Sequence, residues 1–113
     1  MTVIFHIARR ADWLLAPGAG SYAAASLATE GFIHCSTAAQ VVATANRLFR
    51  AQRDLVLLRI DTGKVNVEIR YENLDGGAEL YPHVYGALAI DCITAAHEFA
   101  PRGDGTFEMP LLD

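Results

Sequence analysis

The segment that decides the fold is an apolar, strand-like run leading directly into a helix start, Glu30-Gly31-Phe32-Ile33-His34-Cys35-Ser36-Thr37. It places an imidazole, a thiol and two hydroxyls beside a helix N-terminus, where free backbone N–H groups favour anions. Two further histidines lie in similar runs, Ile4-Phe5-His6-Ile7 and Tyr81-Pro82-His83-Val84-Tyr85-Gly86. Since a surface histidine is not expected in such surroundings, the pattern predicts one site built from three separated segments.

The best-defined helix is predicted over residues 37–53. Thr37 and Gln40 fit a capping box, and apolar residues follow at the spacing of one helical face. A helical segment of one or two turns is expected over residues 9–16, before the loop Pro17-Gly18-Ala19-Gly20. Residues 21–26 are ambiguous, although their alanines favour helix.

Strands are predicted at residues 3–8, 32–35, 54–61 and 65–71, the last from its alternation of apolar and polar residues. Residues 88–99 are expected to be mainly strand, and a turn at 102–105 should lead back through residues 106–109. Strands outnumber the two helices, which fall in the N-terminal half. The sequence therefore predicts a single domain over residues 1–113, with an α+β fold and a small, largely antiparallel twisted sheet.

Composition and charge narrow the class of protein. The chain is 52% hydrophobic and carries a net charge of −4, which argues against non-specific nucleic-acid binding but allows a small nucleotide in a pocket. Cys35 and Cys92 are too few for a disulfide scaffold. The start of the chain lacks a signal-peptide pattern, and no apolar run approaches the roughly 20 residues of a membrane span. We expect a cytoplasmic protein without membrane partners, and the sequence leaves its oligomeric state open.

His34 is the strongest site candidate, because polar residues and a helix start surround it. The side chain of His6 must point away from Phe5 and Ile7, toward a cleft or solvent. His83 lies between tyrosines, which suits a planar ligand, whereas a histidine elsewhere, His97, is expected on the surface. We predict that the imidazoles of His6, His34 and His83 line one concave surface.

Four other residues are candidate ligand contacts. Ser36 could donate its hydroxyl to an anion but is equally explained by helix capping, which is the favoured role for Thr37. Tyr85 could stack on a ring of the ligand. The carboxylate of Glu72 could orient a sugar hydroxyl or a histidine, or be an exposed charge.

Metal and thiol chemistry are weaker alternatives. The histidines, Cys35 and Glu72 are suitable metal ligands, but their spacing matches no zinc motif, so no metal site is predicted and a metal-dependent hydrolase is the least favoured function. His34 and Cys35 are adjacent on a strand and point to opposite faces, which favours a buried, inert Cys35.

Motifs over nearly the whole chain resemble a family of small bacterial proteins, the domain of unknown function 952. The most specific are Gly31-Phe32-Ile33-His34-Cys35-Ser36 and Pro82-His83-Val84-Tyr85-Gly86. That family in turn resembles the ADP-ribosyltransferase fold, which includes the RNA 2′-phosphotransferases.

This resemblance implies roles for the candidate residues. His6 would take the first site position and His34 the second, while His83 or Glu72 would take the third, which departs from the His-Tyr-Glu triad of many transferases. It implies a cleft for NAD, ADP-ribose or a related phosphorylated ligand, with the three histidines as catalytic residues. Ser36, Thr37, Tyr85 and Glu72 would bind the ligand. A nucleotide-binding module without catalysis is the alternative.

Overall fold

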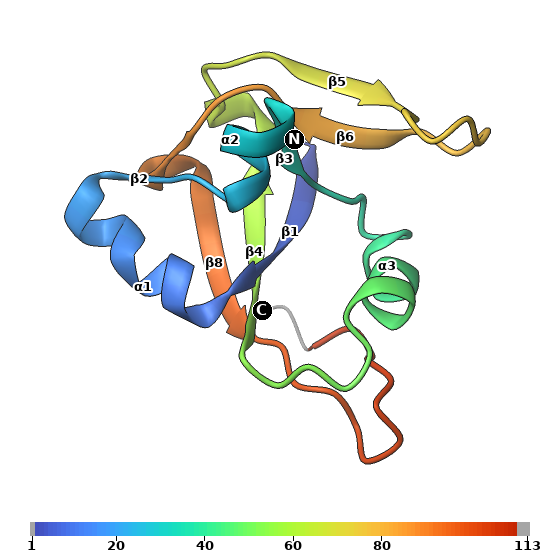
Figure 1. The fold of residues 1–113 in the computed structure, drawn as a ribbon. Coiled ribbons are helices and arrows are strands. Elements are labelled where there is room, and N and C mark those ends of the chain that lie inside the picture. The colour runs from blue at the N-terminus through green and yellow to red at the C-terminus, as the bar shows by residue number, and fades with distance from the viewer. Residues whose placement is uncertain (1, 111–113) are drawn as a thin grey trace.

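The computed structural model describes residues 2–110, which form two three-stranded sheets, a two-stranded pair and three α-helices (Figure 1). The strands are β1 (Val3–Arg9), β2 (Ser21–Tyr22), β3 (Ile33–His34), β4 (Leu55–Asp61), β5 (Ile69–Glu72), β6 (Tyr81–Val84), β7 (Leu88–Ala89) and β8 (Ile93–Glu98). The helices are α1 (Arg10–Ala19), α2 (Ala25–Glu30) and α3 (Val41–Leu48), with 3-10 turns η1 (Thr62–Lys64) and η2 (Ile90–Cys92). The fold is α+β and its strand pairs are antiparallel, as predicted.

The central sheet has the strand order β1-β4-β8 and is covered on both faces. On β1, Ile4 and Ala8 enter one hydrophobic core, whereas Phe5 and Ile7 enter another. This is the alternation that a pleated strand imposes. His6 therefore shares the face of Ile4 and Ala8, pointing away from Phe5 and Ile7 as predicted.

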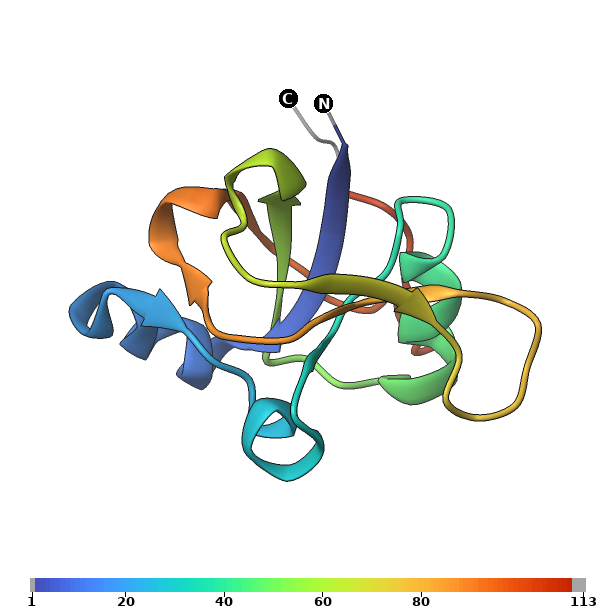
Figure 2. The same cartoon turned by 90° about the horizontal axis from the view of Figure 1, so that it is seen from above.

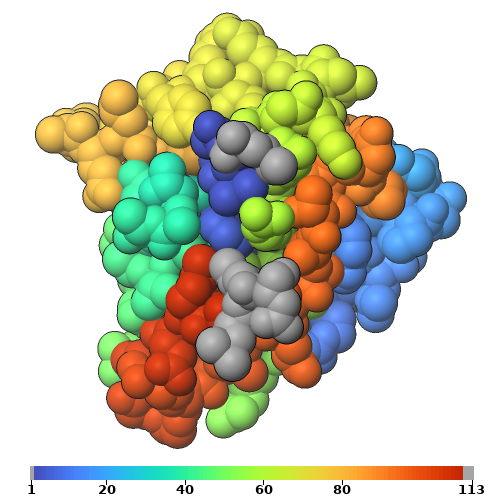
Figure 3. Space-filling view, turned by 180° about the vertical axis from the view of Figure 1, so that it is seen from behind, coloured from blue at the N-terminus to red at the C-terminus, as the bar shows by residue number. Residues whose placement is uncertain are grey.

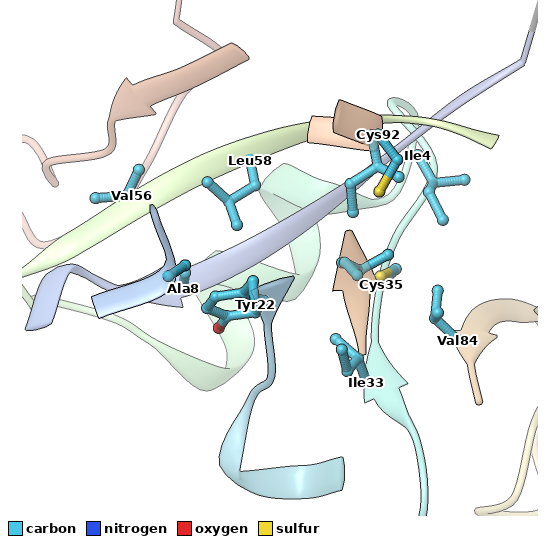
Figure 4. Close-up of a cluster of buried hydrophobic side chains, with 12 residues drawn as sticks. Ile4, Ala8, Tyr22, Ile33, Cys35, Val56, Leu58, Val84 and Cys92 are labelled. Carbon is cyan, nitrogen blue, oxygen red and sulfur yellow. The ribbon is translucent and has the colours of Figure 1, made fainter. Parts of the chain in front are cut away.

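Each core joins the central sheet to other elements. The first contains Tyr22 of β2, Ile33 of β3 and Val84 of β6 (Figure 4). The second contains Val41 of α3 and Phe107 of the C-terminal segment. Burial of this apolar surface is the main driving force that holds the short outer strands in place.

The second sheet, β3-β6-β5, lies across one end of the central sheet (Figures 1 and 2). His34 of β3 lies directly opposite His83 of β6. The segment after β3 joins β1 through two backbone hydrogen bonds between Phe5 and Ser36, of 2.7 and 2.8 Å. This bridge brings His6 next to the strand that carries His34.

Three helices form instead of the two predicted. α1 runs through Pro17 to Ala19 and is longer than expected, and the ambiguous stretch contributes α2. α2 ends at Gly31, whose φ of 89° is left-handed, a conformation that strains any residue with a Cβ. This turn sends the chain directly into β3.

α3 begins at Val41, so the predicted start at Thr37 is wrong. The side-chain amide oxygen of Gln40 accepts a hydrogen bond from the Thr37 N–H, at 3.0 Å, as in a capping box. The Gln40 amide nitrogen, however, donates to Glu79 and to the Leu80 carbonyl, at 3.1 and 2.7 Å. These contacts with the β5–β6 loop hold Gln40 just outside the helix.

Two predicted strands are shorter or absent. The strand predicted from residue 65 forms only at Ile69–Glu72. The turn at 102–105 forms, but residues 106–109 are not a strand. Instead, the Phe107 N–H donates to the Asn46 side chain of α3, at 2.7 Å, and the C-terminal segment lies against α3 (Figure 3). None of the helices in residues 2–110 is long and apolar enough to cross a membrane.

Candidate functional site

A cavity of about 460 Å³ lies where β1, β3 and β6 meet the helices and the β5–β6 loop. Its lining includes His6, His34 and His83, together with Glu72, Arg9 and Arg47. The structure thus brings the three predicted histidines to one cavity. His97 of β8 does not line it and is half-buried rather than exposed.

His6 has a hydrogen-bond partner on each ring nitrogen. Its Nδ1 lies 2.6 Å from the backbone oxygen of His34, and its Nε2 lies 2.8 Å from the hydroxyl of Tyr22. Because a carbonyl oxygen only accepts, Nδ1 carries the proton and Nε2 accepts the Tyr22 O–H. Burial lowers the pKa of His6 to about 4, more than its bond to the His34 carbonyl raises it. His6 is therefore neutral and joins β1, β2 and β3.

Tyr22, which no sequence motif marks, is the third member of this chain of hydrogen bonds. It is only 2% exposed, and burial raises the pKa of its phenol well above the usual value. Its position in an alanine-rich stretch of ambiguous structure concealed it. The one available signal is that a tyrosine is the only large side chain between Gly20 and Leu27.

His83, which is buried, and Glu72, which is half-buried, form a second pair. His83 Nδ1 lies 3.0 Å from the Glu72 carboxylate, and the side chains are 8% and 22% exposed. The Tyr85 hydroxyl donates a short hydrogen bond to the same carboxylate oxygen. The hydrogen bonds from Tyr85 and then His83 lower the pKa of Glu72, and the bond to Glu72 raises the pKa of Tyr85. Glu72 is thus ionised at neutral pH and accepts from both neighbours.

His34 belongs to an aromatic cluster with Phe32 and His83. Phe32 stacks on His83 with ring centroids 4.2 Å apart, and the His34 ring meets His83 edge-on at 5.3 Å. His34 Nε2 also lies 3.0 Å from Glu30, in a pair whose side chains are half exposed. The Gly31 turn places Glu30 beside the strand residue four positions later.

Only two of the four predicted ligand-contact residues line the cavity. Glu72 and Ser36 line the cavity, although Ser36 is buried and its hydroxyl lies 3.4 Å from that of Thr44. Of the described residues, neither Thr37 nor Tyr85 is part of the lining. The ring of Tyr85 lies instead under the Arg70 guanidinium, at 4.6 Å. The part of α3 that reaches the cavity is its second half, from Thr44 to Leu48, and not its N-terminus.

The cavity wall carries charges of both signs. Arg9 and Arg47 supply cations, and the guanidinium of Arg47 lies 6.0 Å from the ring centre of Tyr81, which also lines the cavity. Cys35 reaches the lining too, but it is 4% exposed and burial raises the pKa of its thiol. A buried thiol is a poor nucleophile. Within residues 2–110, no three or more His, Cys, Asp or Glu side chains are arranged so that they could hold a metal ion.

The sequence profile of a family described as "Protein of unknown function (DUF952)" matches residues 7–96. The chain belongs to the DUF952 family. The match begins directly after His6 and spans His34, Glu72 and His83. The predicted membership is confirmed, and no curated protein matches the chain.

Solved structures agree with this assignment. The X-ray crystal structure of protein CC0527 from Caulobacter crescentus is 31% identical, with a TM-score of 0.84 over 95% of this chain and 94% of that one. The solution NMR structure of CC0527 is 33% identical, with a TM-score of 0.81 over 96% and 93% of the two chains. The DUF952 chain described here is therefore similar to CC0527 over nearly its full length.

Proposed function

We propose that the histidine-lined cavity binds a small phosphorylated ligand of the nucleotide type, with NAD and ADP-ribose as the leading candidates, in an ADP-ribosyltransferase-like domain. The observation that carries this proposal is the convergence of His6, His34 and His83 on one cavity. Imidazoles brought together from three separate strands are characteristic of a site rather than of a core.

The size and chemistry of the cavity suit such a ligand. Its volume of about 460 Å³ lies within the range of roughly 300–1,000 Å³ that small-molecule sites occupy. Arg9 and Arg47 can pair with phosphate oxygens. Tyr81 provides aromatic surface for a planar group.

The histidines have different roles in this proposal. His34 and His83 each keep one ring nitrogen without a protein partner among the described residues, so they can hydrogen-bond the ligand. Both nitrogens of His6 are occupied, which supports a positioning role. Ser36 lies in the wall of the cavity, and Tyr85 acts through Glu72.

The saturation of His6 also favours a second candidate, a binding module without turnover. If the domain were an ADP-ribosyltransferase, His6 would occupy the first catalytic position, yet it has no free ring nitrogen to offer a ligand. The two candidates predict the same binding and differ in consumption of NAD.

The test is a titration of the ¹⁵N-labelled protein with NAD, ADP-ribose and a 2′-phosphorylated RNA oligonucleotide, up to millimolar concentration. We expect amide shifts in residues 31–36 and 81–84, and binding weakened at least about tenfold by His83→Ala, since unpaired polar groups in a site are costly. His97→Ala, outside the cavity, is the matched control and should bind normally. If no amide in these two segments shifts, the ligand proposal is wrong, and NAD turnover would eliminate the binding-only alternative.

A further inference from the structure

The imidazole of His83 is held in one orientation by three neighbours. Phe32 stacks on its face, with an angle of 20° between the rings, and His34 meets its ring edge-on. Glu72 binds Nδ1 at 3.0 Å. A ring fixed in this way loses little further freedom when its remaining nitrogen meets a ligand.

The position of the His83 proton follows from the chemistry of Glu72. An ionised carboxylate only accepts hydrogen bonds, so Tyr85 donates its O–H and His83 donates Nδ1–H. In the neutral ring, Nε2 therefore holds the lone pair. Nε2 has no hydrogen-bond partner within residues 2–110. Every side-chain nitrogen in that range that lacks a partner is exposed to solvent to some extent, and this includes Nε2 of His83. Because His83 lines the cavity, this lone pair is accessible to a ligand.

We propose that Glu72 and His83 form a hydrogen-bond-accepting pair that recognises a hydroxyl-bearing ligand such as a ribose, with Tyr85 as a positioning residue. The inference rests on the proposed ligand site and assigns a donor and an acceptor to it. The ligand hydroxyl donates its O–H to the Nε2 lone pair as a hydrogen bond, and the O–H bond stays intact. The Glu72 carboxylate stabilises the positive charge that the ring gains as acceptor, which is how a carboxylate supports a histidine base.

The exposed pair at the same site does not have these properties. His34 and Glu30 are 52% and 50% exposed, so water screens their interaction. Glu72 is less exposed and is held by a second donor, Tyr85. His83, rather than His34, is therefore assigned as the hydrogen-bond acceptor.

Diethyl pyrocarbonate tests this assignment without a ligand, because it acylates an unprotonated imidazole nitrogen. The rate of His83 modification in the folded protein is followed by peptide mass spectrometry. Glu72→Gln removes the charge that supports the lone pair and should slow the rate by about tenfold, since a nearby opposite charge strengthens the basicity of a ring. Tyr85→Phe should slow it several-fold. Glu98→Gln, at an exposed pair with Arg10, is the control and should leave the rate unchanged.

The outcomes separate this inference from the ligand proposal. An unmodified His83, or equal rates in wild type, Glu72→Gln and Tyr85→Phe with each fold confirmed by NMR, would overturn the hydrogen-bond-accepting pair. If the rates change as expected while NAD and ADP-ribose fail to bind, the pair stands and the ligand class is wrong.

Discussion

His6 and His83 are equally buried, each 6% exposed, yet the fold uses them in opposite ways. Both hold a proton on Nδ1 and donate it to an oxygen. They differ at Nε2, which accepts the Tyr22 hydroxyl in His6 and has no partner among the described residues in His83. We call His6 closed, because both of its ring nitrogens are bonded within the fold, and His83 open, because its Nε2 faces the cavity.

This difference shows that burial alone does not distinguish a structural histidine from a site histidine. The partner of Nδ1 also matters. The neutral carbonyl of His34 offers His6 no charge to stabilise an imidazolium, whereas the Glu72 carboxylate offers one to His83. Whether a histidine is structural or belongs to the site therefore depends on two features: whether Nε2 has a partner, and whether the partner of Nδ1 is charged.

Removing the closed histidine should have the largest effect. His6→Ala leaves the His34 carbonyl and the Tyr22 hydroxyl without their partner, and an unsatisfied buried group costs about 1–3 kcal/mol. We therefore expect the free energy of unfolding, measured with urea, to fall by about 4 kcal/mol. The control His97→Ala should cost less than about 1 kcal/mol. A similar loss in both variants would contradict the scaffold role of His6.

Acid should destabilise the protein through the same residue. The folded-state pKa of His6 is about 4, against 6.5 in the unfolded chain. Its contribution is fully present above pH 6.5 and is lost as pH falls toward 4, because only the unfolded chain takes up the proton. The total loss is about 3 kcal/mol.

Urea unfolding of wild type and His6→Gln from pH 7 to 5 measures this contribution. Glu72, whose pKa is lowered, changes its charge only below about pH 4.5, which lies outside the pH range of this experiment. The variant should lose less stability than wild type over the range. Parallel curves would show that His6 does not remain neutral on folding.

Tyr22→Phe removes the hydroxyl that is bonded to Nε2 of His6. It keeps the aromatic contacts of Tyr22 with His6 and Trp13 but leaves His6 Nε2 without a donor. We expect a loss of about 2 kcal/mol in unfolding free energy. A neutral result would mean that water replaces the phenol, so that the nitrogen is not closed.

Glu72→Gln should have the smallest effect on stability. The Gln oxygen can still accept from Tyr85 and from His83 Nδ1–H, so the urea midpoint should stay within error of wild type. A decrease as large as that of Tyr22→Phe would indicate that Glu72 supports the fold rather than the site.

The strands could be predicted from the sequence where the spacing of apolar residues matches the faces that the fold buries. β1 and β4 follow from continuous apolar runs. The side chain of His6 points away from those of Phe5 and Ile7 because successive residues of a strand face opposite sides of the sheet. The start of α3 and the loss of the C-terminal strand did not follow, because long-range contacts decide them. Gln40 bonds the β5–β6 loop, and Phe107 bonds Asn46.

The candidate site was predictable as a set of residues but not as a set of roles. Three histidines in apolar runs identified the cavity that they line. Tyr22, Glu30 and Arg47 were missed because no short-range pattern marks them. The closure of His6 depends on Tyr22, 16 positions away, and the support of Glu72 depends on Tyr85, 13 positions away. Such pairings arise only from the fold.

Hydrogen–deuterium exchange at the imidazole Cε1 of each histidine distinguishes His6, with both ring nitrogens bonded, from His83, with Nε2 open to the cavity. This slow exchange depends on solvent access and on the basicity of the ring, and mass spectrometry resolves it for each histidine in the native protein. At pH 8 we predict that His83 exchanges within a few-fold of half-buried His97, while His6 is at least about tenfold slower, since both its closure and its low pKa retard exchange. Equal rates for His6 and His83, or a faster rate for His6, would show that Nε2 of His6 is no less accessible than that of His83.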